Sequence, residues 1–262
     1  MIEEPYRWVE AIANRREYIE DQLRRGSPVV LLQFADGLLL LTVSRDTRKV
    51  FEVYDRVVFA ALGHPADIER MRLAAIDLAH IEGFNRSVTD VSLRRLVNFG
   101  MSPVLKAAFE QVFSAPYIVK MLLAELGDDA EHDYVAKLDY DGSFTRSEME
   151  SKEVIEVVAG THEAERAMLD YLIDHNGNAR GSLDDALKLA AKAWAVGMET
   201  AERGQVADED EGKPEEVDVE KVLKETLKTR HIEAAVLDRN RPAASKFRLL
   251  DEKEIRAGLK EL

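Results

Sequence analysis

The chain has 262 residues, of which 46% are hydrophobic and 33% charged, so it has enough apolar material for one sizeable core. Its formal net charge is −14, from 50 acidic and 36 basic side chains, which argues against general binding to nucleic acid or anionic membranes. The absence of cysteine excludes disulfides, thiolate nucleophiles and cysteine-ligated metal sites.

The first elements expected along the chain are an amphipathic helix at 5–25 and a β-hairpin at 28–44. Pro5 suits the first turn of the helix, where its missing N–H costs nothing. Apolar residues recur at helical spacing, at Trp8, Ile12, Ile19 and Leu23. Asp36-Gly37 between two apolar runs is typical of a hairpin turn. The second run contains four leucines in succession, which indicates a strand covered on both faces.

Strands and pairs of helices alternate along the rest of the chain. The expected strands are 50–56, 57–62, 117–126, 134–140, 153–159, 232–238 and 246–250, and the expected helices are 65–86, 90–113, 162–175, 182–202, 218–229 and 251–262. Gly100 and Pro103 predict a bend or interruption in the helix at 90–113. Residues 204–218 are acidic and predict a solvated, mobile loop. We therefore expect one domain over 1–262 with an α+β fold, a four-layer α-β-β-α sandwich in which helix pairs cover two packed sheets.

Most short motifs in the chain do not indicate chemistry. Gly63-His64-Pro65 follows a strand and precedes a helix, but the glycines of a phosphate loop are missing and Pro65 removes a backbone donor. None of the six histidines forms an HExxH motif. His162 with Glu165 or Arg166 on one helix face is better explained by a solvated face than by a metal site. We expect no metal and no cofactor.

Gly160-Thr161 is a candidate for the processing site of a self-cleaving hydrolase. Hydrolases of this layered class cut before a Thr, Ser or Cys, whose freed amine then acts as the base. Such a nucleophile belongs at the start of the first strand, whereas Thr161 precedes a helix and is better explained as its N-cap. The first threonine of the chain, Thr42, lies inside a strand. We therefore expect no processed nucleophile.

Residues 15–250 resemble the α-type subunits of the 20S proteasome, especially the bacterial ones. The stretches that carry the resemblance are RREYIEDQLRRGSPVVLLQFADGLLLL, KVFEVYDRVVFAALGHPADIERMRLAAIDLA, LDYDGSF and AAVLDRNRP. The resemblance implies an Ntn-hydrolase fold and a non-catalytic subunit of a heptameric ring. This ring caps the rings of catalytic β-type subunits, admits unfolded protein substrates and receives the C-terminal tails of ATP-driven or other ring activators.

The resemblance also implies a pocket for those tails. Lys49 matches the family's pocket lysine, whose ammonium group pairs with the activator's terminal carboxylate. Gly63 follows at the family's separation, and Gly26 matches the pocket glycine after the first helix. His64 is the fourth expected residue, at a position that is often apolar in relatives.

Two further sets of residues follow from the resemblance. Glu17 and Tyr18 match an acidic–aromatic pair that helps fix the open gate, and the apolar stripe that includes Leu23 is expected to contact the neighbouring subunit's first helix. The expected pore-lining turn consists of Phe113, Ser114, Ala115, Pro116 and Tyr117. The resemblance implies a longer gating segment, whereas about four residues precede the first helix here. We therefore expect a pore that is either permanently open or closed by another element.

Two other functions remain open at this stage. One is a divergent self-processing peptidase of the same fold, and the other is a stand-alone ring scaffold without a β-type partner. No stretch approaches the ~20 apolar residues of a membrane span, and the N-terminus lacks the pattern of a signal peptide. We therefore expect a cytoplasmic protein.

Overall fold

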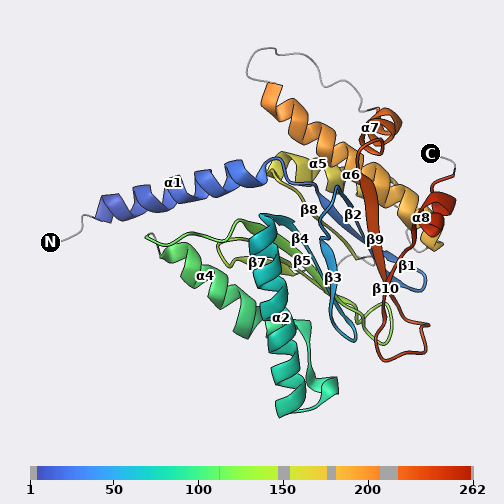
Figure 1. Ribbon diagram of the computed structural model, residues 1–262, viewed down its shortest axis with the longest axis horizontal. Coiled ribbons are helices and arrows are strands. Elements are labelled where there is room, and N and C mark those ends of the chain that lie inside the picture. The colour runs from blue at the N-terminus through green and yellow to red at the C-terminus, as the bar shows by residue number, and fades with distance from the viewer. Residues whose placement is uncertain (1–4, 112, 147–153, 176–180, 207–217, 261–262) are drawn as a thin grey trace.

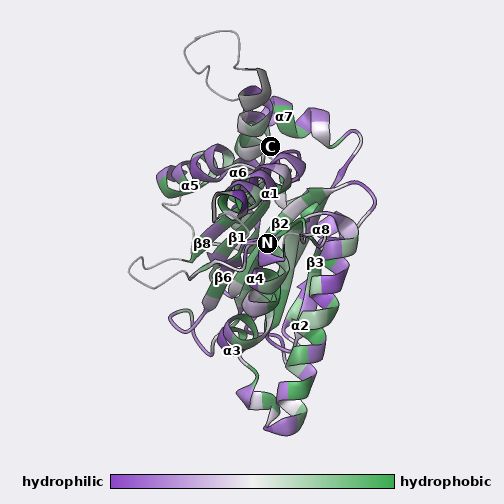
Figure 2. Ribbon diagram, turned by 90° about the vertical axis from the view of Figure 1, so that its left-hand side faces the viewer, coloured by the Kyte–Doolittle hydropathy of each residue, from purple (hydrophilic) through white to green (hydrophobic). Residues whose placement is uncertain are grey.

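The protein is a four-layer α-β-β-α sandwich, as the order of elements predicted. The computed structural model describes residues 5–111, 113–146, 154–175, 181–206 and 218–260. Within these ranges, two five-stranded antiparallel sheets face each other and helices cover both outer faces (Figure 1). Figure 2 shows hydrophobic strands between helices whose residues alternate in hydropathy. In this part of the chain no helix is long and apolar enough to cross a membrane.

The first sheet has the order β10-β9-β2-β1-β8 and contains the predicted hairpin. Its strands are β1 (Val29–Phe34), β2 (Gly37–Ser44), β8 (Ile155–Val158), β9 (His231–Asp238) and β10 (Phe247–Leu249). Phe34 pairs with Gly37 across the two-residue turn. Every residue of β2 is buried, which confirms that the leucine run is covered on both faces. The central position of β2 between β1 and β9 explains this burial.

The second sheet has the order β3-β4-β5-β6-β7. Its strands are β3 (Val50–Tyr54), β4 (Val57–Gly63), β5 (Val119–Glu125), β6 (Tyr134–Leu138) and β7 (Phe144–Arg146). The short β7 was not expected, because it consists of three residues after the Asp141-Gly142 turn. Such a length is too short for alternation to reveal a strand.

The helices lie where helical spacing predicted them. They are α1 (Pro5–Leu23), α2 (Pro65–Asn85), η1 (Val88–Asp90), α3 (Leu93–Arg95), η2 (Leu96–Met101), α4 (Ser102–Glu110), α5 (His162–His175), α6 (Leu183–Val206), α7 (Val219–Thr226) and α8 (Glu252–Gly258). The segment η2 is a π-helix, so the interruption predicted near Gly100 is a change of helix type. Of the acidic segment 204–218, residues 207–217 lie outside the described residues.

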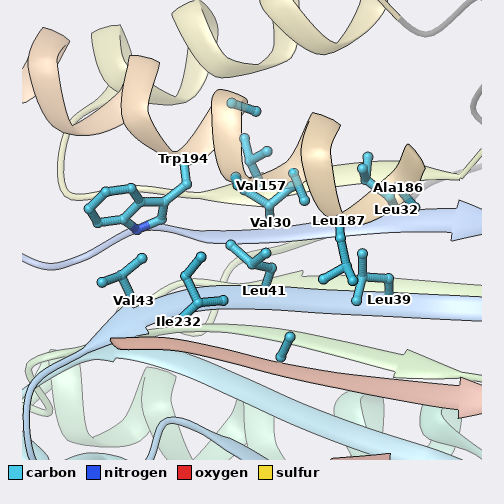
Figure 3. Packing of buried hydrophobic residues seen from close by; sticks show 14 of the residues in the cluster. Val30, Leu32, Leu39, Leu41, Val43, Val157, Ala186, Leu187, Trp194 and Ile232 are labelled. Atoms are coloured by element: carbon cyan, nitrogen blue, oxygen red, sulfur yellow. The ribbon is translucent and has the colours of Figure 1, made fainter. Parts of the chain in front are cut away.

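Three apolar clusters hold the layers together. One lies between the two sheets and includes Ile19 and Leu23 of α1. A second joins α2, α3 and α4 to the outer face of the second sheet. The third packs α5 and α6 on the first sheet, where Trp194 of α6 and Leu187 point toward β1 and β2 (Figure 3). Trp194 is fully buried and its indole N–H donates to Ser27 Oγ at 3.0 Å.

Candidate functional site

The predicted pocket residues come together at one end of the β3–β4 hairpin. The Ala61 N–H donates to the carbonyl oxygen of Lys49 across the hairpin at 3.2 Å. Gly63 ends β4 two residues later, so its backbone lies at the same end of the sheet as Lys49. Gly26 follows α1, and its N–H donates to the Leu23 carbonyl at 2.7 Å. The segment after α1, the residue before β3 and the end of β4 therefore converge here.

Lys49, Gly63 and Gly26 line a single hollow of about 370 Å³. The lining residues are Gln22, Arg25, Gly26, Ser27, Val43, Ser44, Arg45, Thr47, Lys49, Gly63 and Arg230. We call this the Lys49 hollow. The fourth predicted residue, His64, does not line it. The exposed His64 ring accepts a hydrogen bond from the Ala66 N–H at 3.3 Å and so caps α2.

Gly63 is required by the backbone at this corner. Its φ of +140° lies in a region that residues with a Cβ rarely adopt, and an added Cβ would lie 2.1 Å from the Ile118 carbonyl oxygen. The His64 N–H donates to the same oxygen at 2.8 Å. The glycine thus allows β4 to turn into α2 while the backbone stays close to β5.

A second hollow of about 320 Å³ adjoins the first and shares Thr47, Lys49 and Gly63 with it. Its other lining residues are Arg48, Phe51, Pro65, Ile68 and Glu69. Three of these are apolar, so Lys49 stands between a polar hollow and a more apolar one. A peptide end with a carboxylate and an apolar side chain matches such a pair of surfaces.

Glu233 of β9 fixes the backbone that carries Lys49. Its carboxylate accepts hydrogen bonds from the N–H groups of Lys49, at 3.0 and 3.1 Å, and of Val50, at 2.9 Å. The Ser44 hydroxyl donates to it at 3.2 Å. Glu233 is buried, and a buried carboxylate that accepts several donors forms strong, directional bonds. It therefore ties the start of β3 to the first sheet.

The ammonium group of Lys49 is partly desolvated. Burial lowers its pKa to about 8, while Glu233 acts to raise it and Arg230 to lower it further. Lys49 is therefore still mainly cationic at neutral pH, but less well solvated than a surface lysine. A carboxylate that approached Lys49 would replace the lost solvation and stabilise the charge.

Glu233→Gln is expected to lower the free energy of unfolding by about 1–3 kcal/mol, because the amide NH₂ would face N–H donors and the charge-assisted bonds would be lost. The pKa of Lys49 should fall as well, since the carboxylate that raises it is removed. Urea unfolding would measure the first effect and NMR titration of labelled lysine the second. Glu52→Gln on the exposed side of β3 is the matched control, and equal effects of the two variants would contradict this role.

The predicted gate and ring residues of α1 divide into two groups. Glu17 and Tyr18 are exposed, and Tyr18 retains 52% of its surface, so both are accessible to another subunit. Leu23 is fully buried within its own subunit, between the two sheets. The expectation that Leu23 contacts a neighbouring subunit is therefore wrong. Leu23→Asp would instead place a charge in the core of its own subunit. Near the start of α1, Trp8 and Val9 are exposed as well, at 50% and 67%.

The predicted pore-lining turn is bonded to α1. Residues 113–117 follow α4, and Phe113 is almost fully exposed. The guanidinium group of Arg15 donates to the carbonyl oxygens of Ser114 at 2.8 Å and of Ala108 at 2.9 Å. Arg15 thus links the first helix to the turn. Sequence reasoning missed it, because a separation of 99 residues leaves no local signal.

Ser27 is another residue that sequence reasoning missed. It follows Gly26 and precedes β1, which is where a processed nucleophile of this fold class belongs. Its hydroxyl donates to the Val43 carbonyl oxygen at 2.6 Å and accepts from the Trp194 indole, and the side chain is buried. Its position directly after Gly26 and before the first strand was the sequence signal that could have identified it.

Thr161, the candidate that the sequence analysis considered, accepts a hydrogen bond from the Ala164 N–H at 3.2 Å, as an N-cap residue does.

Glu165 corrects a second expectation, because its face of α5 is not solvated. The buried carboxylate binds the ammonium groups of Lys137 at 2.5 Å and Lys120 at 3.4 Å. Burial opposes its charge, but the two lysines outweigh this and leave the pKa below its usual range. His162 lies 3.9 Å away. Within the described ranges no three His, Asp or Glu side chains gather as metal ligands.

Comparison with models of known protein families gives no match for this chain. Curated proteins do match it. The proteasome subunit alpha of Streptomyces coelicolor is 30% identical over 241 residues, which cover 91% of this chain and 82% of the relative. That of Actinosynnema mirum is 32% identical over 240 residues, or 91% and 80%. Together with the sandwich fold, this near full-length similarity shows that the chain belongs to the proteasome α-subunit family.

Proposed function

We propose that this chain is the non-catalytic α-type subunit of a 20S proteasome, and that it forms a heptameric outer ring which controls substrate entry and receives activator tails. The observation that carries the proposal is the convergence of Lys49, Gly63 and Gly26 on one hollow. These three residues are separated in the sequence, and a tail-binding role requires that they lie around one hollow. The task is intracellular protein degradation, and the cytoplasm, where ATP-driven activators and unfolded substrates are available, is the proposed location.

Tail docking follows from the chemistry of the Lys49 hollow. A terminal carboxylate that enters it would pair with the ammonium group of Lys49, as in other sites that capture chain ends. Gly63 and Gly26 carry no side chains, so the backbone around the lysine leaves room for a peptide. The adjoining apolar hollow with Phe51, Pro65 and Ile68 would receive a side chain of the same tail.

Two exposed apolar surfaces support assembly with other proteasome subunits. The first is the projecting part of α1 with Trp8 and Val9, which we assign to the neighbouring α-type subunit (Figure 1). The second is formed by exposed residues near the end of α2 and on the following segments: Ile81, Phe84, Val88 and Phe99. We assign it to the ring of β-type subunits. Large exposed apolar residues that cluster in this way mark interaction surfaces.

The non-catalytic assignment is supported by the surroundings of Ser27. Its only hydroxyl hydrogen is donated to the Val43 carbonyl, and the Trp194 indole occupies an acceptor site, so the oxygen is poorly placed to attack a peptide bond. The competing function, a self-processing peptidase, needs a chain that begins at a freed Ser or Thr. N-terminal sequencing of the purified protein should find Met1 or Ile2, and a chain that begins at Ser27 would contradict the non-catalytic role.

Electron microscopy tests the assembly. The protein purified alone and after coexpression with a candidate β-type subunit should give seven-membered rings and stacked rings, respectively. Peptide hydrolysis should depend on the β-type subunit. Rings that never stack on any β-type subunit would favour the stand-alone scaffold, and single subunits under both conditions would contradict the ring proposal.

A further inference from the structure

The Lys49 hollow is strongly cationic although the protein is acidic. Four of its lining side chains are cations: Arg25, Arg45, Lys49 and Arg230. None of its lining side chains is acidic, in a chain whose formal net charge is −14. These cations come from the segment that follows α1, from the loop between β2 and β3, and from the residue that precedes β9. Their convergence is therefore a property of the folded chain and not of a basic stretch of sequence.

The Glu233 carboxylate acts electrostatically on Lys49, but the four cations have no directly bonded counterion among the described residues. Within the described ranges, none of these side chains forms an ion pair or a hydrogen bond. The neighbouring carboxylate of Glu233 does not line the hollow, because it is buried and occupied by the Lys49 and Val50 N–H groups and by the Ser44 hydroxyl. The hollow thus presents unbalanced positive charge to whatever enters it.

The local repulsion is large enough to affect protonation. Arg230 lies close enough to Lys49 to lower its pKa, in addition to the larger effect of burial. One terminal carboxylate carries a single negative charge and would leave most of the positive charge unbalanced. Additional carboxylates would remove repulsion among the cations as well as form their own ion pairs.

We propose that the Lys49 hollow selects tails that carry acidic side chains within their last few residues, in addition to the terminal carboxylate. This inference rests on the proposed tail-docking function and extends it to the chemical class of the tail. The terminal carboxylate binds Lys49, and the acidic side chains lie against Arg45 and Arg230 on the walls of the hollow. An electrostatic preference of this kind also speeds association with acidic tails at low ionic strength.

Fluorescence anisotropy with labelled ten-residue peptides tests the proposal on the assembled protein. The peptides share a free C-terminus and the last two residues, and they carry two Glu, two Gln or two Lys at the preceding positions. A fourth peptide has two Glu and an amidated C-terminus. The Glu peptide should bind about tenfold more tightly than the Gln peptide at low salt, because two partly screened ion pairs contribute about 1.4 kcal/mol together. The difference should shrink as salt rises.

Variants assign the preference to the hollow. Arg45→Gln and Arg230→Gln should each reduce the preference for Glu over Gln about threefold, and Arg230→Lys should retain it, because the charge remains. Arg24→Gln is the matched control, since Arg24 is exposed beside Arg25 but does not line the hollow. Native mass spectrometry of each variant would verify that the rings persist.

The possible outcomes separate the inference from the proposed function. If Glu and Gln peptides bind equally, and both lose affinity on Lys49→Ala, tail docking stands and the acidic preference is wrong. If no peptide shows Lys49-dependent binding, the docking function itself fails. If Arg45→Gln or Arg230→Gln breaks the rings, these cations neutralise acidic groups of a neighbouring subunit, and the acidic preference is overturned as well.

Discussion

Lys49→Ala is expected to reduce activator-stimulated degradation strongly while the rings stay intact. The substitution removes the cation that would pair with the tail's carboxylate, and such a charge-assisted contact contributes about 2 kcal/mol, or roughly thirtyfold in affinity. Lys49 has no hydrogen-bonded side-chain partner among the described residues, so the subunit should still fold. Degradation of an unfolded substrate with and without a cognate activator measures the effect, and native mass spectrometry measures the rings.

The control for this variant is Lys253→Ala, which removes an exposed lysine on α8 far along the chain from β3. Activator-stimulated degradation by the Lys253→Ala variant should match that of the unaltered protein. Unchanged stimulation in Lys49→Ala would remove Lys49 from the tail pocket. A loss of rings in Lys49→Ala would instead assign the lysine to subunit contacts.

The pH dependence of tail binding gives an independent signature of Lys49. Its pKa of about 8 in the free protein should rise when a carboxylate binds, so the complex holds a proton that the free protein loses. Affinity should therefore be constant below about pH 7.5 and should fall as pH rises above 8, by at most tenfold per pH unit, until the pKa of the complex is reached. In Lys49→Arg the charge persists and the profile should be flat over this range. Peptide anisotropy at a series of pH values measures both profiles.

Trp8→Asp is expected to convert rings into single subunits. The start of α1 projects from the body (Figure 1). Trp8 lies in the first turn of this helix, and half of its surface is exposed within one subunit. A tryptophan of this kind at the centre of a contact contributes about 2 kcal/mol or more. A closed ring repeats the loss at every contact, so even a moderate loss per contact disrupts assembly. Native mass spectrometry measures the population of rings.

Asn14→Asp is the matched control, because it adds the same carboxylate to an exposed polar position of the same helix. It should leave the rings intact. Circular dichroism of Trp8→Asp should show a folded subunit, since Trp8 belongs to none of the three core clusters. Intact rings in Trp8→Asp would contradict the assembly role of the projecting helix.

The fold could be predicted from local patterns because nearly every element carries one. The Asp36-Gly37 turn gave the β1–β2 hairpin, and the leucine run gave a strand buried on both faces, as observed. Helical spacing gave α2 with nearly its observed bounds. Gly100 predicted an interruption of the helix but not that it is a π-helix. The helix type depends on the packing around this glycine, here against Leu78.

The site was only partly predictable, because its supporting contacts connect distant positions. Lys49, Gly63 and Gly26 were found through resemblance, and the structure brings them together. Glu233 lies 184 residues from Lys49, and nothing near it in the sequence indicates that its carboxylate binds the β3 backbone. The sequence indicated a solvated Glu165, because the lysines that neutralise it, Lys120 of β5 and Lys137 of β6, are distant from α5 in the sequence. Long-range pairing of this kind leaves no period to detect.

The uneven anchoring of α1 has a consequence for the order of assembly. Its last turns are held by Ile19 and Leu23 in the core and by a hydrogen bond from Tyr140 to Glu20 at 2.7 Å, whereas its first turns project outward. A helical segment of one or two turns without a packing partner is only marginally stable in water. Backbone amides at the start of α1 should thus exchange rapidly in a lone subunit and slowly in a closed ring. Amide exchange at the start of α1 would then report ring closure directly, because contact with the neighbouring subunit stabilises this part of the helix.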